Sequence, residues 1–160
     1  MFDAAVSPTD SSAGLGIVVR DDRGEWVYGI SRFIGRCSIL MAELWAILEG
    51  ISFAWSQGYQ YVELESDNLE AVHLALSTSP DETVCGLVLS IKDGLRKIRH
   101  VTLRHVYREG NRVANRLATM GRMQRGPRVT LSEAPAELRE IVEAEKSQTE
   151  EAFTFDPGGV

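Results

Sequence analysis

Cysteine is scarce in this chain, and the two that occur, Cys37 and Cys85, stand far apart. Their spacing fits neither a disulfide framework nor a zinc site, so a reducing compartment is expected. The sequence also has no apolar run near the ~20 residues that a membrane span needs. Residues 1–6 lack the basic segment and the apolar run of a signal peptide. We therefore expect a soluble intracellular protein with no membrane partner, in either the nucleus or the cytoplasm.

A glycine-rich phosphate loop is absent as well, since none follows the first strand-like segment. This disfavours an α/β enzyme that acts on small molecules. The composition also lacks the bias of disordered or repetitive chains, because the 160 residues are 44% hydrophobic and 25% charged. Such a chain is long and apolar enough to bury the core of one globular domain, which we expect to be monomeric.

Charge is unevenly distributed along the chain, although the net charge is only −6. From Ser132 onward, eight acidic residues face two basic ones, whereas residues 92–128 hold eleven basic residues and two acidic ones. The acidic average argues against a nucleic-acid partner, because lysine and arginine supply most of the affinity for phosphates. The basic segment, however, is suited to face a phosphate backbone.

Hydrophobic periodicity predicts strands in the first part of the chain. Residues 14–20 and 26–33 alternate as two strands joined by a tight turn over 21–25. Residues 3–6 are expected to end an earlier strand that pairs with this hairpin. If that strand begins at Met1, it is unusually short.

The remaining chain alternates between helices and strands. Apolar residues at three- and four-residue spacing predict helices over residues 39–57, 69–76, 84–98 and 111–120. Alternating patterns predict strands over residues 61–65 and 101–106. Asn111 is expected to cap the last helix. The order β-β-β-α-β-α-α-β-α indicates a mixed sheet with helices packed on its faces.

A boundary is expected after the last predicted helix, where Gly126 and Pro127 break the pattern. We assign residues 1–121 to the domain and residues 122–160 to an acidic C-terminal tail. Residues 136–145 have helical character, whereas residues 150–160 are expected to be frayed or disordered.

Three acidic residues stand at the ends of predicted elements. Asp3 lies on the first strand, Glu43 in the first turn of the main helix, and Asp67 directly after the fourth strand. Taken singly, each fits an ordinary structural role as a solvated charge, a favourable charge at a helix N-terminus or a helix cap. If the three converge, their mutual repulsion is tolerable mainly when cations bind between them. Mg²⁺ is the natural candidate, since it prefers carboxylate oxygens.

Five short motifs follow one another along residues 2–121. They are Asp3-Ala4-Ala5, Gly14-Leu15-Gly16-Ile17-Val18-Val19-Arg20-Asp21 followed by Gly24, Ala42-Glu43-Leu44-Trp45-Ala46, Glu65-Ser66-Asp67-Asn68, and the run from His105 through Asn111 and Asn115 to Ala118. In this order and spacing they resemble the ribonuclease H family. The resemblance is to the type 1-like domains that are abundant in plant genomes and related to retroelement ribonucleases.

This resemblance implies a ribonuclease H-like α/β fold. Its mixed five-stranded sheet would combine a three-strand antiparallel meander with two parallel strands and carry helices on both faces. The implied activity is a hydrolase that cuts the RNA strand of an RNA–DNA hybrid, with four carboxylates that hold two Mg²⁺ ions, or Mn²⁺ in their place. By motif, Asp3, Glu43 and Asp67 take the first three metal-binding and catalytic positions.

Asn115 takes the fourth position, where the family has aspartate. Asparagine keeps a carbonyl oxygen of the same shape but removes one negative charge. Two unit charges roughly 4 Å apart interact by about 4 kcal/mol at an effective dielectric constant near 20, as an upper guide. We therefore expect weaker metal binding and weaker activity than in a domain with four acids.

The resemblance also points to residues that contact nucleic acid. Arg108 and Arg112 flank the metal side of the last helix and are expected to reach phosphates. Ser66 and Asn68, beside Asp67, are expected to meet the 2′-hydroxyl groups that distinguish RNA. Capping and solvation are equally good explanations for these four residues. His105 lies on a predicted strand, and we expect it to be structural.

A second function stays open at this point. The chain could be a catalytically decayed domain of retroelement origin that only binds nucleic acid or a protein. The short first strand and Asn115 both favour decay.

Overall fold

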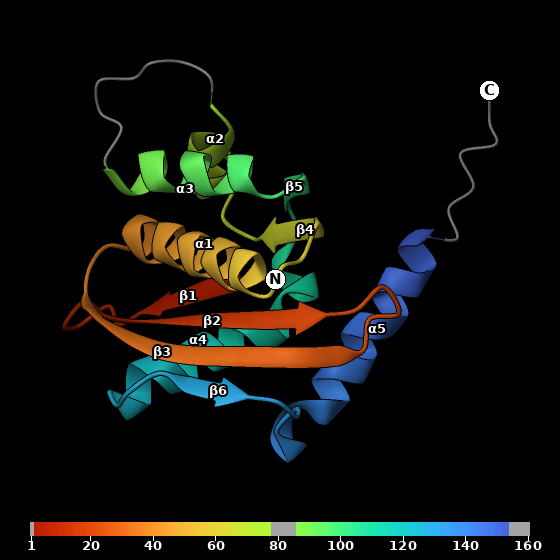
Figure 1. The fold of residues 1–160 in the computed structure, drawn as a ribbon. Helices are drawn as coiled ribbons and strands as arrows, with labels where there is room; N and C mark the ends of the chain where they lie inside the picture. Colours follow the sequence, from red (N-terminus) through yellow and green to blue (C-terminus); the bar gives the residue numbers. More distant parts are fainter. Residues whose placement is uncertain (1, 78–85, 154–160) are drawn as a thin grey trace.

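The computed structural model describes residues 2–77 and 86–153. At its centre is a six-stranded sheet in the order β5-β4-β1-β2-β3-β6 (Figure 1). The strands are β1 (Phe2–Val6), β2 (Ser12–Arg20), β3 (Trp26–Arg36), β4 (Tyr61–Ser66), β5 (His100–His105) and β6 (Val129–Leu131). The first three form an antiparallel meander, and β4 pairs in parallel with both β1 and β5. The mixed sheet expected from the sequence is confirmed, with β6 as an additional edge strand.

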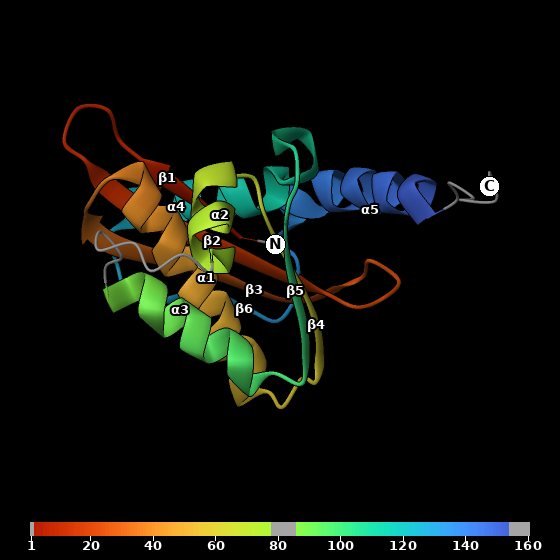
Figure 2. The same cartoon turned by 90° about the horizontal axis from the view of Figure 1, so that it is seen from above.

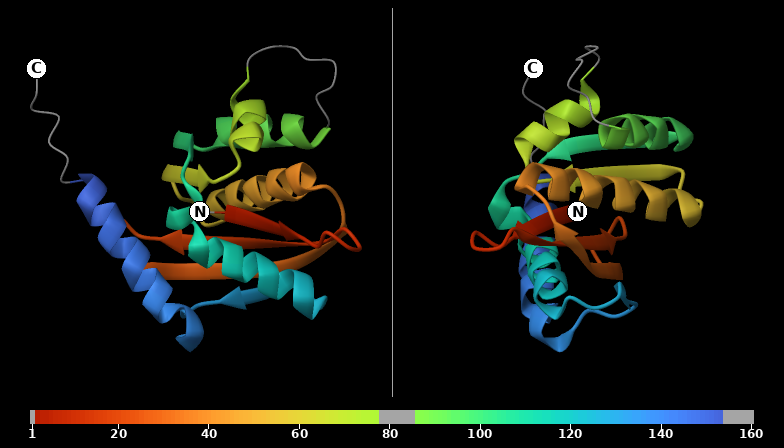
Figure 3. Two further views of the ribbon diagram at one scale, coloured as in Figure 1. Left: turned by 180° about the vertical axis from the view of Figure 1, so that it is seen from behind. Right: turned by 90° about the vertical axis from the view of Figure 1, so that its left-hand side faces the viewer.

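Helices cover both faces of this sheet. They are α1 (Ile39–Ser56), α2 (Leu69–Leu76), α3 (Gly86–Lys97), α4 (Arg112–Gln124) and α5 (Arg139–Phe153), with single 3₁₀ turns η1 (Arg108–Gly110) and η2 (Ala136–Leu138). Figure 2 shows α1, α2 and α3 together, and the view from behind in Figure 3 shows α4 and α5 on the other face. The predicted start of α3 at Val84 lies outside the described residues, as do residues 154–160 of the end predicted to be frayed over 150–160. The prediction is wrong for residues 150–153, which belong to α5.

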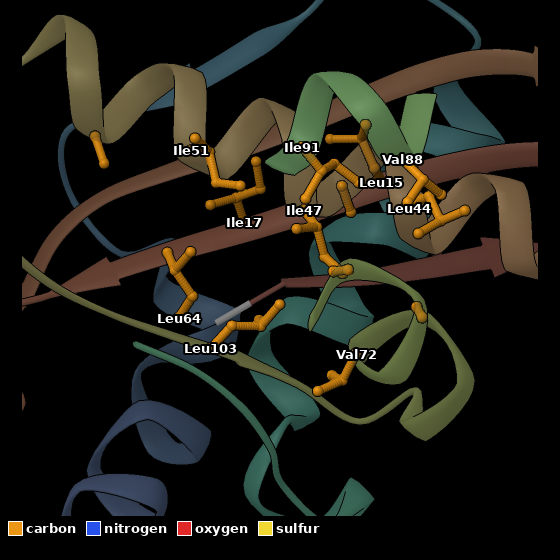
Figure 4. Close-up of a cluster of buried hydrophobic side chains, with 14 of the residues drawn as sticks. Leu15, Ile17, Leu44, Ile47, Ile51, Leu64, Val72, Val88, Ile91 and Leu103 are labelled. Carbon is orange, nitrogen blue, oxygen red and sulfur yellow. The ribbon is translucent and has the colours of Figure 1, made fainter. Parts of the chain in front are cut away.

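Helix α1 is the centre of the main core. It begins after Ser38, whose hydroxyl accepts a hydrogen bond from the Met41 N–H at 3.2 Å. Its buried side chains, Leu44, Ile47 and Ile51, pack on the sheet (Figure 4). By length and mean hydropathy (1.3 over 18 residues) α1 is also able to cross a membrane, but half of it is buried inside the fold. It therefore behaves as the core helix of this domain.

Helix α4 lies unusually close to β2 because two glycines allow it. A Cβ atom at Gly16 would lie 2.2 Å from the Ala114 carbonyl oxygen, and one at Gly14 would lie 2.3 Å from that of Ala118. No side chain fits at those distances, so the Gly14-Leu15-Gly16 motif fixes the position of α4 on the sheet.

The chain beyond residue 121 is packed on the domain. Helix α4 continues to Gln124, and β6 pairs with β3 through Gly29 to Ser31. Leu138 and Val142 are buried in a second apolar cluster with Val18, Val113 and Leu117. Leu138 and Val142 are spaced for one face of a helix, and their burial explains why this segment packs on α4. The domain boundary after residue 121 stays a prediction.

Candidate metal centre

The three acidic residues predicted as ligands come from three different elements. Strands β1 and β4 are neighbours, and Phe2 pairs with Ser66, so the next residues of the two segments, Asp3 and Asp67, lie close together. Helix α1 crosses β1 at this point. Small side chains at Ala4, Ala13 and Ala42 form the contact and let the helix approach closely.

The carboxylates of Asp3, Glu43 and Asp67 converge. One oxygen from each lies within 4.8 Å of the other two. Asp3 and Glu43 are each only 2% exposed, and the Asp67 side chain is 8% exposed. The cluster is therefore largely shielded from solvent.

Neighbouring backbone satisfies only part of this cluster. The Ala4 N–H lies 2.9 Å from Asp3 Oδ1 and 3.2 Å from Glu43 Oε1, and it donates to both. Among the described residues, Asp3 Oδ2 and Glu43 Oε2 receive no hydrogen bond. Buried carboxylate oxygens are normally hydrogen-bonded, so these two are open positions for a ligand.

The electrostatics of the cluster are unfavourable for three bare carboxylates. Burial, and then the charge of Asp67, raise the pKa of Asp3 to about 6. Burial, followed by the nearby Asp3 and Asp67, raises the pKa of Glu43 to about 10. Glu43 therefore keeps a proton at neutral pH unless a cation replaces it.

Asn115 is the fourth group at this site. It lies on α4, which the glycines of β2 hold against the sheet, and it contacts the Asp3 carboxylate closely enough to lower the pKa of Asp3. Asn111 occupies the N-cap position of this helix as predicted, but its side chain makes no capping hydrogen bond. Three carboxylates and one amide form an all-oxygen donor set, which suits Mg²⁺ or Mn²⁺.

Two residues border Asp67. The Arg108 side chain is 85% exposed, and its Nε lies 3.7 Å from Asp67 Oδ2. His105 Nε2 lies 3.2 Å from the Asp67 carbonyl oxygen, which fits the structural role expected for it. Arg108 is thus free to extend from the site into solvent.

The remaining predicted contact residues have different surroundings. Ser66 is fully buried, and its hydroxyl accepts a hydrogen bond from the Asn68 N–H at 3.2 Å. The Asn68 side chain caps α2 by accepting from the Ala71 N–H at 2.9 Å. Arg112 is exposed at the first turn of α4. Of the four predicted contact residues, Arg108 and Arg112 are the most exposed.

The comparison with protein families gives one match that covers most of the chain. A family model described as "Reverse transcriptase-like" matches residues 1–121. The chain belongs to this ribonuclease H-like family. An Arabidopsis thaliana protein named "Putative ribonuclease H protein" is 38% identical to it over 117 residues, which is 72% of this chain. The chain spans only 19% of the length of that relative.

Solved structures share the fold of this ribonuclease H-like chain. RNase H1 from the archaeon Halobacterium salinarum superposes with a TM-score of 0.70 at 22% identity, over 78% of this chain and 96% of its own. LC11-RNase H1, solved in complex with an RNA/DNA hybrid, gives 0.68 at 19% identity, over 78% and 95%. The foamy viral protease-reverse transcriptase, also solved with a hybrid, gives 0.65 at 20% identity, over 77% and 19%.

Two contributions to the site were missed from the sequence. The Ala4 N–H joins Asp3 to Glu43, and a backbone donor leaves no trace in residue types. Glu145 accepts a hydrogen bond from the Val113 N–H at 3.1 Å, two residues before Asn115. The one available signal for Glu145 was its position on the apolar face of the predicted helix, one turn after Val142.

Proposed function

We propose that this chain is a metal-dependent endoribonuclease that cuts the RNA strand of RNA–DNA hybrids. The observation that carries the proposal is the convergence of Asp3, Glu43 and Asp67 within 4.8 Å, with open oxygens and raised pKa values at Asp3 and Glu43. Such a cluster is costly in a folded protein unless cations bind to it.

The residues divide the work as follows. Asp3, Glu43, Asp67 and Asn115 would hold two Mg²⁺ ions, or Mn²⁺ in their place. When bound, such ions lower the pKa of water and stabilise charge on a phosphate undergoing in-line displacement. The chain itself needs no nucleophilic side chain. Asn115 contributes one neutral oxygen instead of a carboxylate, so we expect weak metal binding and a slow reaction.

The nucleic-acid interface is proposed to surround the metal site. Arg108 extends from Asp67 into solvent, and Arg112 is exposed at the adjacent end of α4, so both are able to contact phosphates. Ser66 and Asn68 flank Asp67 along the chain, where 2′-hydroxyl contacts are expected. A contact to Ser66 requires its buried hydroxyl to become exposed. The two relatives solved with RNA/DNA hybrids support this class of ligand.

A second candidate is a catalytically decayed domain of retroelement origin that binds nucleic acid without cutting it. Asn115 favours it, because the missing charge weakens the only metal site among the described residues. The match to a viral reverse transcriptase is in keeping with a retroelement origin. Intracellular localisation and a monomeric state also stay predictions.

A cleavage assay separates the two functions. The parent chain, Asn115→Asp and Asp67→Asn are incubated with a hybrid whose RNA strand is labelled, in Mg²⁺ and in Mn²⁺. We expect weak cleavage by the parent, cleavage at least tenfold faster by Asn115→Asp, and none by Asp67→Asn.

Each other outcome has a defined meaning. If neither the parent nor Asn115→Asp cuts while both bind hybrid, the chain is a binding domain. If Asp67→Asn cuts as fast as the parent, the proposed site is wrong. Labelled single-stranded RNA and duplex DNA serve as substrate controls, and they should remain intact.

A further inference from the structure

The first turn of α4 is capped by a side chain from α5. Asn111 gives no side-chain cap, and the N–H groups of Arg112 and Val113 bond instead to the carboxylate of Glu145 on α5. The Val113 N–H lies 3.1 Å from Glu145 Oε1. An anion at this end of a helix satisfies unpaired N–H groups and interacts favourably with the helix dipole.

Glu145 is itself fixed by Arg20 at the end of β2. The two side chains form a buried ion pair, with Glu145 only 3% exposed. Arg20 Nη1 also donates to the Val142 carbonyl oxygen at 3.3 Å, one turn before Glu145. The pair thus joins β2, α4 and α5 at one point, which we call the Arg20–Glu145 clamp.

The clamp lies close to the metal site along α4. Asn115 follows Val113 by two residues and contacts Asp3. A shift at the first turn of α4 therefore displaces Asn115 relative to Asp3. Glu145 lies outside residues 1–121, the range that the family model matches.

We propose that Glu145 is a positioning residue, which holds the start of α4 so that Asn115 reaches the cluster of Asp3, Glu43 and Asp67. This inference rests on the proposed metal-dependent function for its meaning, but the positioning itself is a property of the metal-free protein. Groups that orient a metal ligand typically change metal affinity by about 10- to 100-fold when replaced.

Mn²⁺ affinity in a double-mutant cycle tests the proposal. Calorimetry is carried out on the full chain with Glu145→Gln, Asn115→Ala and the combined variant. We expect Glu145→Gln to weaken Mn²⁺ binding about tenfold in the parent and by less than twofold when Asn115 is already alanine. Glu140→Gln, an equal charge change at an exposed position of α5, should leave the affinity unchanged.

A second readout needs no metal. The side-chain amide of Asn115 is followed by NMR in ¹⁵N-labelled protein without divalent ions. The Asn115 amide signal should shift in Glu145→Gln and stay in place in Glu140→Gln. It should also stay close to its parent position in Arg20→Lys, which preserves the positive charge of the clamp. The dispersion of the other amide signals reports whether each variant is folded.

These results decide between clear alternatives. An equal loss of Mn²⁺ affinity in the parent and in the Asn115→Ala background overturns the proposal, because Glu145 would then act on general stability. An unmoved Asn115 signal in folded Glu145→Gln overturns it as well. If the parent binds no Mn²⁺, the proposed function fails, and the NMR signal alone decides whether Glu145 positions Asn115.

Discussion

Buried carboxylates occur in two opposite settings in the described residues. Asp3 and Glu43 are 2% exposed, and their neighbours are each other, Asp67, the Asn115 side chain and a backbone N–H. Glu145 is 3% exposed, but Arg20 and the start of α4 surround it with positive charge and N–H donors. Similar burial thus comes with a protein cation in one place and without one in the other.

The difference indicates which acids serve the fold. Glu49, 9% exposed, follows the pattern of Glu145, since Arg32 Nη1 lies 2.7 Å and Arg128 Nε 3.4 Å from its carboxylate oxygens. Glu145 and Glu49 thus each have an arginine partner within the chain. An acid without one needs a proton or an ion from outside, and the proposed function depends on this distinction.

The largest expected effect on stability comes from breaking the ion pair of Arg20 and Glu145. Arg20→Met leaves Glu145 buried without its cation, and the free energy of unfolding should fall by about 3–5 kcal/mol. Urea unfolding, followed by circular dichroism, measures the change.

Arg104→Met is the matched control for that variant. Arg104 also pairs with two acids, Glu63 and Glu65, but its side chain is 56% exposed. An exposed pair contributes at most about 1 kcal/mol. Equal losses in the two variants would contradict the role of burial.

The next effect concerns the unpaired side and depends on pH. The pKa of Glu43 is raised from 4.5 to about 10, so the folded chain keeps a proton that the unfolded chain releases above about pH 4.5. Stability is then lost as the pH rises between these two values. Glu43→Gln removes this loss, because its side chain does not ionise.

The free energies of unfolding of the metal-free parent and of Glu43→Gln should therefore diverge from pH 5 to pH 9, with the variant more stable at the higher pH. Saturating Mn²⁺ at high pH should raise the free energy of unfolding of the parent toward that of the variant. Parallel curves for the two proteins would show that Glu43 is solvated and carries its charge freely.

The smallest expected effect is at the exposed edge of the site. Arg108→Ala should change the free energy of unfolding by less than about 0.5 kcal/mol, because its contact with Asp67 is long and solvated. If Arg108 contacts a phosphate, the variant should bind hybrid more weakly, and the slope of log affinity against log salt should fall by about one unit. An unchanged slope would remove Arg108 from the interface.

The sequence predicted much of the acidic cluster but not the Arg20–Glu145 clamp. The residues alone left the convergence of Asp3, Glu43 and Asp67 conditional, and the resemblance carried by their motifs implied that they share a site. The packing of β2 against α4 through Gly14 and Gly16 belongs to the same motifs. The predicted strands and helices up to residue 121 agree with the structure, apart from their ends.

The paired side was not predictable in the same way. Glu145 was grouped with an acidic tail, since its neighbours along the chain are also charged. Its burial depends on Leu138 and Val142 packing on α4, and on Arg20, which is 125 residues away in the chain. Strand β6 was missed for a similar reason, because its three residues become a strand only by pairing with β3.

The most direct test of the account is a count of protons released when Mn²⁺ binds near pH 7. Calorimetry in buffers of different ionisation enthalpy gives this number for the parent and for Glu43→Gln. Because raised pKa values keep Glu43 protonated, and Asp3 in part, the parent should bind Mn²⁺ and release about one proton, while Glu43→Gln binds more weakly and releases fewer. Equal affinity and equal proton release in both proteins would contradict a metal centre at this cluster.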